Sequence, residues 1–210
     1  MPKAPRVARV WAPLLATLLA AAPIGAPVGA TGIEIDVTGE AEGTIVIDLF
    51  EDVAPLHVER ITTLAEEGAY EDVVFHRVID RFMAQTGDVE FGNLGQDMRY
   101  AGRGGSTYDD LPAEFSDLPF DRGTLGMARS QSPNSANSQF FIVFEPAPHL
   151  NGQYTVFGQV VDGMDVVDMI RRGRGRNGAV TGEPDRMTAV RVLDFDPVAP
   201  EPEAEEEASE

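Results

Sequence analysis

FHRVIDRFMAQTGD, from Phe75 to Asp88, and SQFFIV, from Ser138 to Val143, are the two stretches that decide the fold of this chain. Both are rich in aromatic and β-branched residues, which predicts β-strands. Side chains alternate between the two faces of a strand. The second stretch therefore has two different faces, one with Gln139, Phe141 and Val143 and the other with Phe140, Ile142 and Phe144. A face that mixes phenylalanine with an uncharged amide is typical of an apolar pocket for a peptide-like ligand, whereas the opposite face is typical of a core.

The rest of the chain predicts several more strands and only two helices. One helix is expected from Pro55, which can begin a helix because its missing N–H is not needed there, to Gly68, a typical C-terminal cap. The second helix is expected over Gly163 to Arg172. The further strands are expected at Ile33–Val37, Thr44–Leu49, Thr124–Ala128, Thr155–Val161 and Thr188–Phe195, with long glycine-rich loops at Gly87–Asp117 and Arg171–Asp185. Many strands with two distant helices favour an all-β barrel over a parallel α/β sheet.

The first thirty residues have the pattern of a secretory signal peptide. Lys3, Arg6 and Arg9 form a positive segment, an apolar run follows, and Val28–Ala30 offers the small residues of a cleavage site before Thr31. The alternative is an uncleaved membrane anchor, but an apolar run of about 13 residues is short of the ~20 that span a bilayer. We therefore expect a cleaved signal peptide at 1–30, a periplasmic or secreted protein, and no stable membrane insertion after cleavage.

The composition limits the partners of the mature chain. Loss of residues 1–30 would remove three basic residues and no acidic ones, leaving 13 basic against 35 acidic side chains and a formal charge of −22. Such a charge disfavours nucleic acid as a ligand. The chain has no cysteine, which excludes disulfides and thiolate metal sites. Residues 197–210 are rich in proline and glutamate, without apolar periodicity, and are expected to form a disordered acidic tail.

From about Glu34 to Asp196, within the expected single domain of residues 31–196, the chain resembles the cyclophilin-type peptidyl-prolyl cis/trans isomerases. The resemblance rests on Phe75–Asp88, on LGMARSQSPNSANSQFFIVF from Leu125 to Phe144, and on HLNGQYTVFGQVVDGMDVVDMI from His149 to Ile170. It implies a mainly β fold, a closed eight-stranded antiparallel barrel capped by two α-helices. It also implies rotation of X-Pro peptide bonds in unfolded or partly folded polypeptides, by a monomer that uses no cofactor and no metal.

The resemblance also assigns roles to residues of this chain. Arg77 matches the catalytic arginine of the family, although an isolated arginine on a strand is ordinarily a surface residue. The residues that match the family's substrate-binding positions are Phe82, Met83, Phe141 and Leu150 for the proline pocket, Gln85 and Gln139 for the peptide backbone, Ala128 and Arg129 for the rim, and Gly102, His149 and Tyr154 around it. Taken singly, a phenylalanine or methionine of this kind is more often a core residue. Eukaryotic members carry tryptophan where this chain has His149, which implies weak cyclosporin binding here. They carry histidine where it has Tyr154, which keeps an aromatic wall with a polar tip, so substrate binding is expected to survive.

Other readings of the same residues predict different chemistry. His76 is expected to be buried and hydrogen-bonded, because it faces away from Arg77, and His57 is expected on the solvated side of its helix. The serines between Ser130 and Ser138 lack the context of a nucleophile elbow, so a hydrolase is disfavoured. Two alternatives stay open: a cyclophilin-like module that binds proline-containing segments without turnover, and a lipocalin-like carrier. Retention of Arg77 favours the isomerase over the first, and the two helices and long loops disfavour the second.

Overall fold

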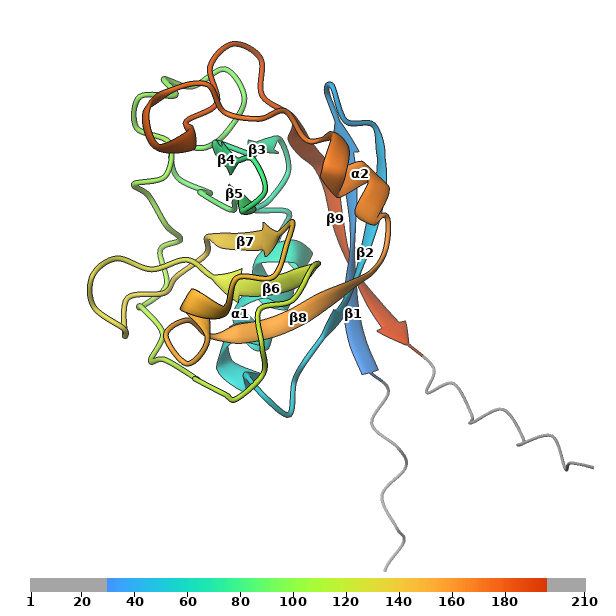
Figure 1. Ribbon diagram of the computed structural model, residues 1–210, viewed down its shortest axis with the longest axis vertical. Coiled ribbons are helices and arrows are strands. Elements are labelled where there is room, and N and C mark those ends of the chain that lie inside the picture. The colour runs from blue at the N-terminus through green and yellow to red at the C-terminus, as the bar shows by residue number, and fades with distance from the viewer. Residues whose placement is uncertain (1–29, 196–210) are drawn as a thin grey trace, which may run out of the picture.

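Nine strands form one antiparallel sheet that curls around a hydrophobic core (Figure 1). The computed structural model describes residues 30–195. Residues 1–29 of the expected signal peptide and the whole expected tail lie outside the described residues. In the part of the chain that is described, no helix is both long enough and apolar enough to cross a bilayer.

The elements follow the order expected from the sequence, with small shifts at their ends. The strands are β1 Ala30–Thr38, β2 Gly43–Leu49, β3 Val73–Val74, β4 Arg77–Ile79, β5 Met83–Thr86, β6 Thr124–Met127, β7 Phe140–Val143, β8 Val156–Asp162 and β9 Arg186–Phe195. The helices are α1 Pro55–Glu66 and α2 Met164–Met169, with two short 3-10 turns, η1 Pro148–Leu150 and η2 Arg176–Gly178.

The sheet differs from the closed eight-stranded barrel expected from the sequence. Its strand order is β3-β9-β1-β2-β8-β6-β7-β5-β4, so it has nine strands and stays open between β3 and β4. One strand that the sequence analysis did not list is the short β3, which precedes the predicted stretch Phe75–Asp88, while Phe75 and His76 lie outside any strand. The Phe75 N–H donates to the Asp185 carbonyl at 2.9 Å, which separates the short β3 from the short β4.

A loop occupies the free edge of β4 and prevents the sheet from closing there. The Gly173 N–H donates to the Val78 carbonyl at 2.9 Å, and the Val180 N–H donates to the His76 carbonyl at 3.0 Å. In Figure 1 this loop, between α2 and β9, passes over β4. Exposed strand edges invite pairing with other chains, so a loop that covers one protects it. The same loop brings η2 next to Arg77.

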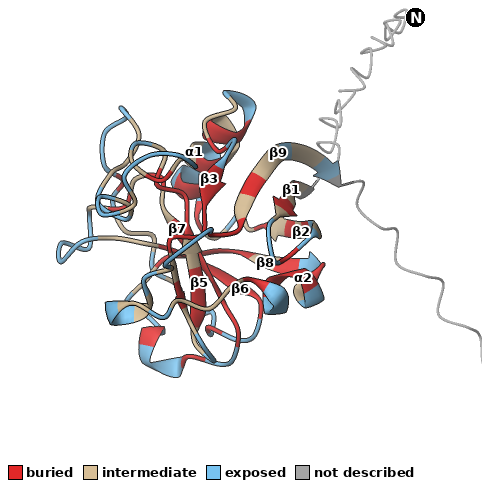
Figure 2. Cartoon of the chain, turned by 90° about the horizontal axis from the view of Figure 1, so that it is seen from above, coloured by how far each residue is buried: buried red, intermediate tan, exposed pale blue. Residues whose placement is uncertain are grey.

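The two faces of β7 separate two hydrophobic clusters, as the alternation of its side chains predicted. Phe140, Ile142 and Phe144 belong to the large core inside the curled sheet, where β1 and β2 contribute buried isoleucines. Phe141 and Val143 belong to a smaller cluster on the other face, together with Met83, Phe120, Ala147, Leu150 and Val156. Figure 2 shows the buried residues concentrated on the strands, with exposed residues on the loops around them. The smaller cluster forms the base of the site described below.

The two helices begin where the sequence predicted, but both are shorter. Pro55 occupies the first turn of α1, and Gly68 beyond its end has φ +70, a left-handed conformation that glycine adopts without strain. α2 has only six residues, because Ile170 leaves the helix with an extended backbone (ψ 127). α1 contacts β9 and α2 contacts β2, and Figure 1 shows them at different ends of the curled sheet.

Candidate active site

Two adjoining cavities lie beside β4, β5 and β7. The smaller, of about 150 Å³, is here called the small pocket, and the larger, of about 470 Å³, the polar groove. Gln85, Ala128 and Arg129 line both, so the cavities meet there. The small pocket is lined by nine of the twelve residues that the sequence predicted for the site: Arg77, Phe82, Met83, Gln85, Ala128, Arg129, Phe141, Leu150 and Tyr154.

The base of the small pocket is a rigid aromatic arrangement. The Phe141 ring stacks on Phe120 with centroids 5.7 Å apart, and it meets Tyr154 edge to face, also at 5.7 Å. Gly126 makes this possible, because a Cβ atom there would lie 2.4 Å from Cζ of Phe141 and 2.6 Å from Cε1 of Phe120. Met83 and Leu150 complete the buried apolar surface. The pocket therefore offers a slot with an apolar, closely packed base.

Arg77 lies half-buried at the edge of the small pocket, and three contacts with oxygen atoms fix its guanidinium. Nη1 donates to Oε1 of Gln85 at 3.0 Å, and Nε donates to the main-chain carbonyl of Asn177 at 3.0 Å. Nη2 lies 3.4 Å from Oδ1 of Asn177. Burial lowers the pKa of Arg77, and the nearby Tyr154 opposes this shift, but a guanidinium remains protonated at neutral pH. The site thus holds one oriented positive charge over an apolar slot.

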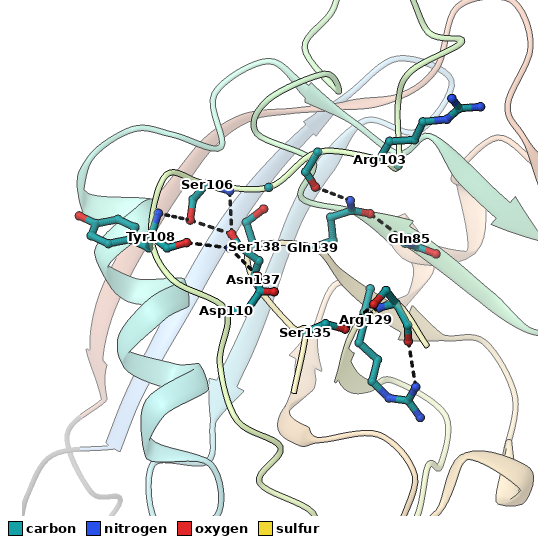
Figure 3. Close-up of a pocket in the computed structure, with 15 residues that line it drawn as sticks. Gln85, Arg103, Ser106, Tyr108, Asp110, Arg129, Ser135, Asn137, Ser138 and Gln139 are labelled. Atoms are coloured by element: carbon teal, nitrogen blue, oxygen red, sulfur yellow. Dashed lines mark hydrogen bonds between the residues drawn. The ribbon is translucent and has the colours of Figure 1, made fainter. Parts of the chain in front are cut away.

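A chain of amides connects Arg77 with the polar groove. Nε2 of Gln85 donates to Oε1 of Gln139 at 3.0 Å, and Nε2 of Gln139 donates to the Gly104 carbonyl at 2.8 Å (Figure 3). Each side-chain NH2 group has a second hydrogen, and each carbonyl oxygen a second lone pair. Both glutamines are therefore oriented by the protein and still have capacity to bind a peptide backbone.

The wall of the polar groove on the glycine side depends on one buried carboxylate. Asp88 accepts hydrogen bonds from the main-chain N–H groups of Gly102 at 2.7 Å, Gly104 at 3.0 Å, Phe91 at 2.9 Å and Glu90 at 3.1 Å. Gly102 has φ +88, and a Cβ atom there would lie 3.1 Å from the His76 ring. Gly102, which was expected beside the proline pocket, thus lines the polar groove. Its positive φ and the nearby His76 ring both favour a glycine at this position.

Ala128 and Arg129, which the resemblance assigned to the rim of the site, line both cavities. The Arg129 guanidinium lies 4.4 Å from the centroid of the Tyr154 ring and donates to the Gln153 carbonyl at 2.8 Å. The Ala128 N–H donates to the Gln139 carbonyl at 2.9 Å, so this main-chain donor is already used within the protein. Figure 3 shows Arg129 and Ser135 on this side of the groove.

His149 is the one predicted site residue that lines neither cavity. It is exposed, and its ring lies 5.3 Å from the Phe82 ring, on the outer side of the small pocket. Gly102 and Gln139, the remaining two of the twelve, line the polar groove only. The structure therefore places eleven of the predicted residues at the two cavities and His149 on the rim behind Phe82.

Two asparagines at the site were missed by the sequence analysis. Asn177 lies in η2 with φ +57, a left-handed conformation uncommon for residues other than glycine, and it contacts Arg77 from 100 positions away. Asn137 connects the walls of the polar groove: its Oδ1 accepts from the Ser106 N–H at 2.7 Å, and its Nδ2 donates to the Tyr108 carbonyl at 3.0 Å. The Asn177-Gly178 pair signals a left-handed turn, but nothing local connects it with Arg77.

The expectation for His57 was wrong, and that for His76 was right only about burial. His57 is fully buried, because Glu114 reaches over the start of α1: Oε2 of Glu114 lies 2.6 Å from Nδ1 and accepts the His57 N–H at 3.1 Å. Burial lowers the pKa of His57, and Glu114 opposes the shift. His76 is buried, but neither of its ring nitrogens makes a hydrogen bond of good geometry with residues 30–195.

The side chains of residues 30–195 that could bind a metal ion do not cluster. Among residues 30–195, no three His, Asp or Glu side chains come together as metal ligands do. The groups that the site offers are an oriented guanidinium, two oriented amides and a pocket with an apolar base.

Comparison with known proteins agrees with this geometry. Residues 33–192 match the family model for the cyclophilin type peptidyl-prolyl cis-trans isomerase/CLD. A curated relative from Brucella suis, named "Probable peptidyl-prolyl cis-trans isomerase", is 58% identical over 154 residues, which are 72% of this chain and 78% of the relative. A peptidyl-prolyl cis-trans isomerase from Synechococcus elongatus is 40% identical over 154 residues, 72% of this chain and 91% of that protein.

A solved structure shares the fold as well. The crystal structure of a cyclophilin type peptidyl-prolyl cis-trans isomerase from Cryptosporidium parvum superposes with a TM-score of 0.67 and 26% sequence identity, covering 80% of this chain and 99% of that one. The match of the family model over most of the described residues, the two bacterial relatives and this structure lead to one conclusion. The chain belongs to the family of cyclophilin-type peptidyl-prolyl cis-trans isomerases.

Proposed function

We propose that this protein accelerates the rotation of X-Pro bonds in exported polypeptides while they fold, and that Arg77 is its catalytic residue. The observation that supports the proposal best is the Arg77 guanidinium, held by Gln85 and Asn177 at the edge of an apolar pocket. Rotation about a peptide C–N bond costs about 18–20 kcal/mol because that bond has partial double-bond character. Without a catalyst, X-Pro isomerisation takes tens of seconds or longer.

The reaction makes and breaks no covalent bond, so the protein has only to bind the twisted amide more tightly than either planar isomer. In the twisted state the prolyl nitrogen becomes pyramidal and can accept a hydrogen bond. We propose that the pyrrolidine ring enters the small pocket against Phe141 and Met83, and that Arg77 donates to this nitrogen. Every ~1.36 kcal/mol of stabilisation specific to the twisted state increases the rate tenfold.

Gln85 and Gln139 would hold the peptide backbone during the rotation. The hydrogen bond between them fixes both amides before a substrate arrives, which reduces the ordering that binding has to impose. Gln85 lines both cavities and Gln139 lines the polar groove, so their remaining N–H and C=O capacity is available to a peptide that occupies both. One side of the X-Pro bond is thus held while the other turns.

The test is the rate of isomerisation of a proline tetrapeptide by the wild type and by Arg77→Ala. Loss of a charged donor that acts only in the transition state should lower kcat/KM by roughly 10²- to 10³-fold with little change in stability. Arg77→Lys should recover only part of the loss, because one ammonium cannot keep the contacts with Gln85 and Asn177 simultaneously.

Arg81→Asn is the matched control. It removes an exposed guanidinium paired with Glu145, at a position with φ +58 that asparagine tolerates. We expect its kcat/KM to stay within about twofold of the wild type. Wild-type kcat/KM in Arg77→Ala would refute the catalytic assignment, and absence of catalysis in the wild type would favour the alternative of a binding module without turnover.

The export part of the proposal rests on the sequence of residues 1–30 alone. A positive segment, an apolar run and Val28–Ala30 together are typical of a cleaved signal peptide. N-terminal sequencing of the protein from a native or heterologous bacterial host should give a chain that begins near Thr31, in the periplasm or the medium. Recovery of chains that begin at Met1 from the cytoplasm alone would contradict it.

A further inference from the structure

The arginines of this protein divide into two groups. Of the 13 arginines among residues 30–195, seven form ion pairs with carboxylates, for example Arg172 with Asp80 at 3.2 Å and Arg81 with Glu145 at 3.1 Å. Within the same range the other six have no carboxylate oxygen within 4.0 Å: Arg60, Arg77, Arg103, Arg129, Arg174 and Arg176. The second group is not spread evenly over the surface.

Four of these arginines line the two cavities or contact residues that do, and the other two lie in the loop that contacts Arg77. Arg77 and Arg129 line the small pocket, and Arg103 and Arg129 line the polar groove (Figure 3). Arg60 lies behind the groove, 4.9 Å from the centroid of the Tyr108 ring that lines it, and donates to the Asn137 carbonyl at 3.2 Å.

Arg174 and Arg176 belong to the loop that covers β4 (Figure 1). Arg176 directly precedes Asn177, whose carbonyl accepts the Nε hydrogen of Arg77. Both side chains are exposed. They add two exposed positive charges to the loop that contacts Arg77, while Arg103 adds one in the polar groove.

Few carboxylates oppose these charges at the site. Asp110 lines the polar groove, but it lies at the end formed by Tyr108 and Asn137, where it accepts a hydrogen bond from Nδ2 of Asn137 at 3.2 Å (Figure 3). Asp80 and Glu145, near the turn between β4 and β5, are each paired with an arginine. Asp88 is buried and surrounded by main-chain N–H groups.

We infer that the preferred substrates are polypeptides with aspartate or glutamate within two residues of the proline. This inference rests on the proposed isomerase function of the same site. Between Thr31 and Asp196 the chain carries 13 basic and 29 acidic side chains, a formal charge of −16, so the molecule as a whole repels anionic chains. A patch of positive charge at the site attracts an acidic segment there, while the rest of the surface disfavours contact elsewhere. The charge pattern therefore selects both the segment and where it binds.

The test compares peptides that differ only in charge. Three pentapeptides, Xaa-Ala-Pro-Phe-Xaa with Xaa as Glu, Gln or Lys, are followed by NMR exchange spectroscopy, which measures cis/trans rates without a coupling protease. We expect kcat/KM to decrease from Glu through Gln to Lys, with at least about fivefold between Glu and Lys at low salt. The difference should largely disappear in 1 M NaCl, where the screening length is about 3 Å.

Single variants locate the effect. Arg103→Gln and Arg174→Gln should each lower the Glu-to-Lys ratio by roughly 1.4- to fivefold, as expected for one exposed charge pair. Arg191→Gln is the matched control: it removes the same charge from β9, where Arg191 pairs with Glu34 and Asp36, and should leave the ratio unchanged.

The outcomes separate this inference from the proposed function. Equal kcat/KM for the three peptides, or a preference for Lys, would overturn the inference while leaving the isomerase intact. A decrease of the ratio in Arg191→Gln as large as in Arg174→Gln would also overturn it, since net charge and not the placed arginines would then be responsible. Failure to accelerate any of the peptides would instead refute the proposed function.

Discussion

Asn177 offers the sharpest test of how the catalytic arginine is oriented. Its main-chain carbonyl reaches Nε of Arg77 at 3.0 Å because the residue adopts φ +57 and ψ 32 within η2. Asn177→Val should displace this carbonyl, since a β-branched residue is a rare outlier in the left-handed region and costs about 1–2 kcal/mol there. Asn177→Gly should keep the carbonyl in place, because glycine adopts this conformation without strain.

The size of the effect follows from the contacts. A hydrogen bond to a charged group contributes about 1.5–3 kcal/mol, which corresponds to roughly a 10- to 150-fold change in rate if the whole contribution acts through the orientation of Arg77. Asn177→Val should lose kcat within this range. Asn177→Gly loses only the 3.4 Å contact between Oδ1 and Nη2, so its kcat should stay within about threefold of the wild type.

The assay separates kcat from KM by NMR exchange spectroscopy on a proline tetrapeptide at saturating and limiting concentrations. A positioning role predicts that KM stays nearly constant while kcat falls, because the small pocket itself is unchanged. The Nε–H resonance of Arg77 provides a second readout, since it should move in Asn177→Val and keep its position in Asn177→Gly. Two results would refute the reasoning: wild-type kcat in Asn177→Val, or a loss in Asn177→Gly as large as in Arg77→Ala.

Three further predictions concern the base, the interior and the rim of the site. Gly126→Ala should separate the Phe120 and Phe141 rings, destabilise the protein by about 1–3 kcal/mol in urea unfolding and raise KM; an unchanged KM would contradict the role given to this stack. Burial lowers the pKa of His76 to about 4, although Asp88 opposes the shift. The unfolded chain, with a histidine pKa of about 6.5, therefore binds a proton first, and stability should fall by about 3 kcal/mol between pH 6.5 and pH 4. His76→Gln should flatten this dependence, and parallel stability curves for the two proteins would count against it. His149→Trp should increase cyclosporin affinity by roughly tenfold or more with modest change in peptide turnover, since an indole N–H on the rim could satisfy an otherwise unpaired carbonyl; tight inhibition of the unmutated protein in a titration would argue the opposite.

The features that could be predicted from the sequence depend on local periodicity or on a dense motif. Alternation in Phe140–Val143 was sufficient to assign each side chain to the core or to the site, because a strand in a sheet with two buried faces has only two choices. The resemblance carried by the motif from Phe75 to Asp88 assigned roles to Arg77, Met83 and Gln85 together, and the structure brings them side by side because β4 and β5 are consecutive strands of one hairpin. The first inference needed only local alternation, and the second needed the family resemblance.

The features that could not be predicted depend on distant partners. Helical spacing marks the residues of α1 that face the sheet, but His57 is buried by Glu114, which lies 57 positions away in a loop. The open edge of the sheet has a similar cause, since Gly173 and Val180 reach β4 from a loop whose path has no periodic signal. In each case the deciding contact joins an element to a loop, and loop conformations follow from individual hydrogen bonds more than from residue patterns.

The four main-chain N–H groups that donate to the Asp88 carboxylate also determine where this chain can accept an insertion. Glu90 and Phe91 lie at the start of a surface loop, and Gly102 and Gly104 lie at its end. The Asp88 carboxylate therefore holds both ends of this loop. Its first part is attached to the body, where the Leu94 N–H donates to the Asp72 carbonyl at 2.9 Å, but at Gly95 a Cβ atom would meet nothing within 4 Å. Doubling the length of a flexible loop costs only about 0.6 kcal/mol. Residues inserted after Gly95 should therefore lengthen this loop without moving Gly104 or Gln139, which donates to the Gly104 carbonyl. This position is therefore suited to the insertion of a tag or a second binding module, and to insertions in evolution.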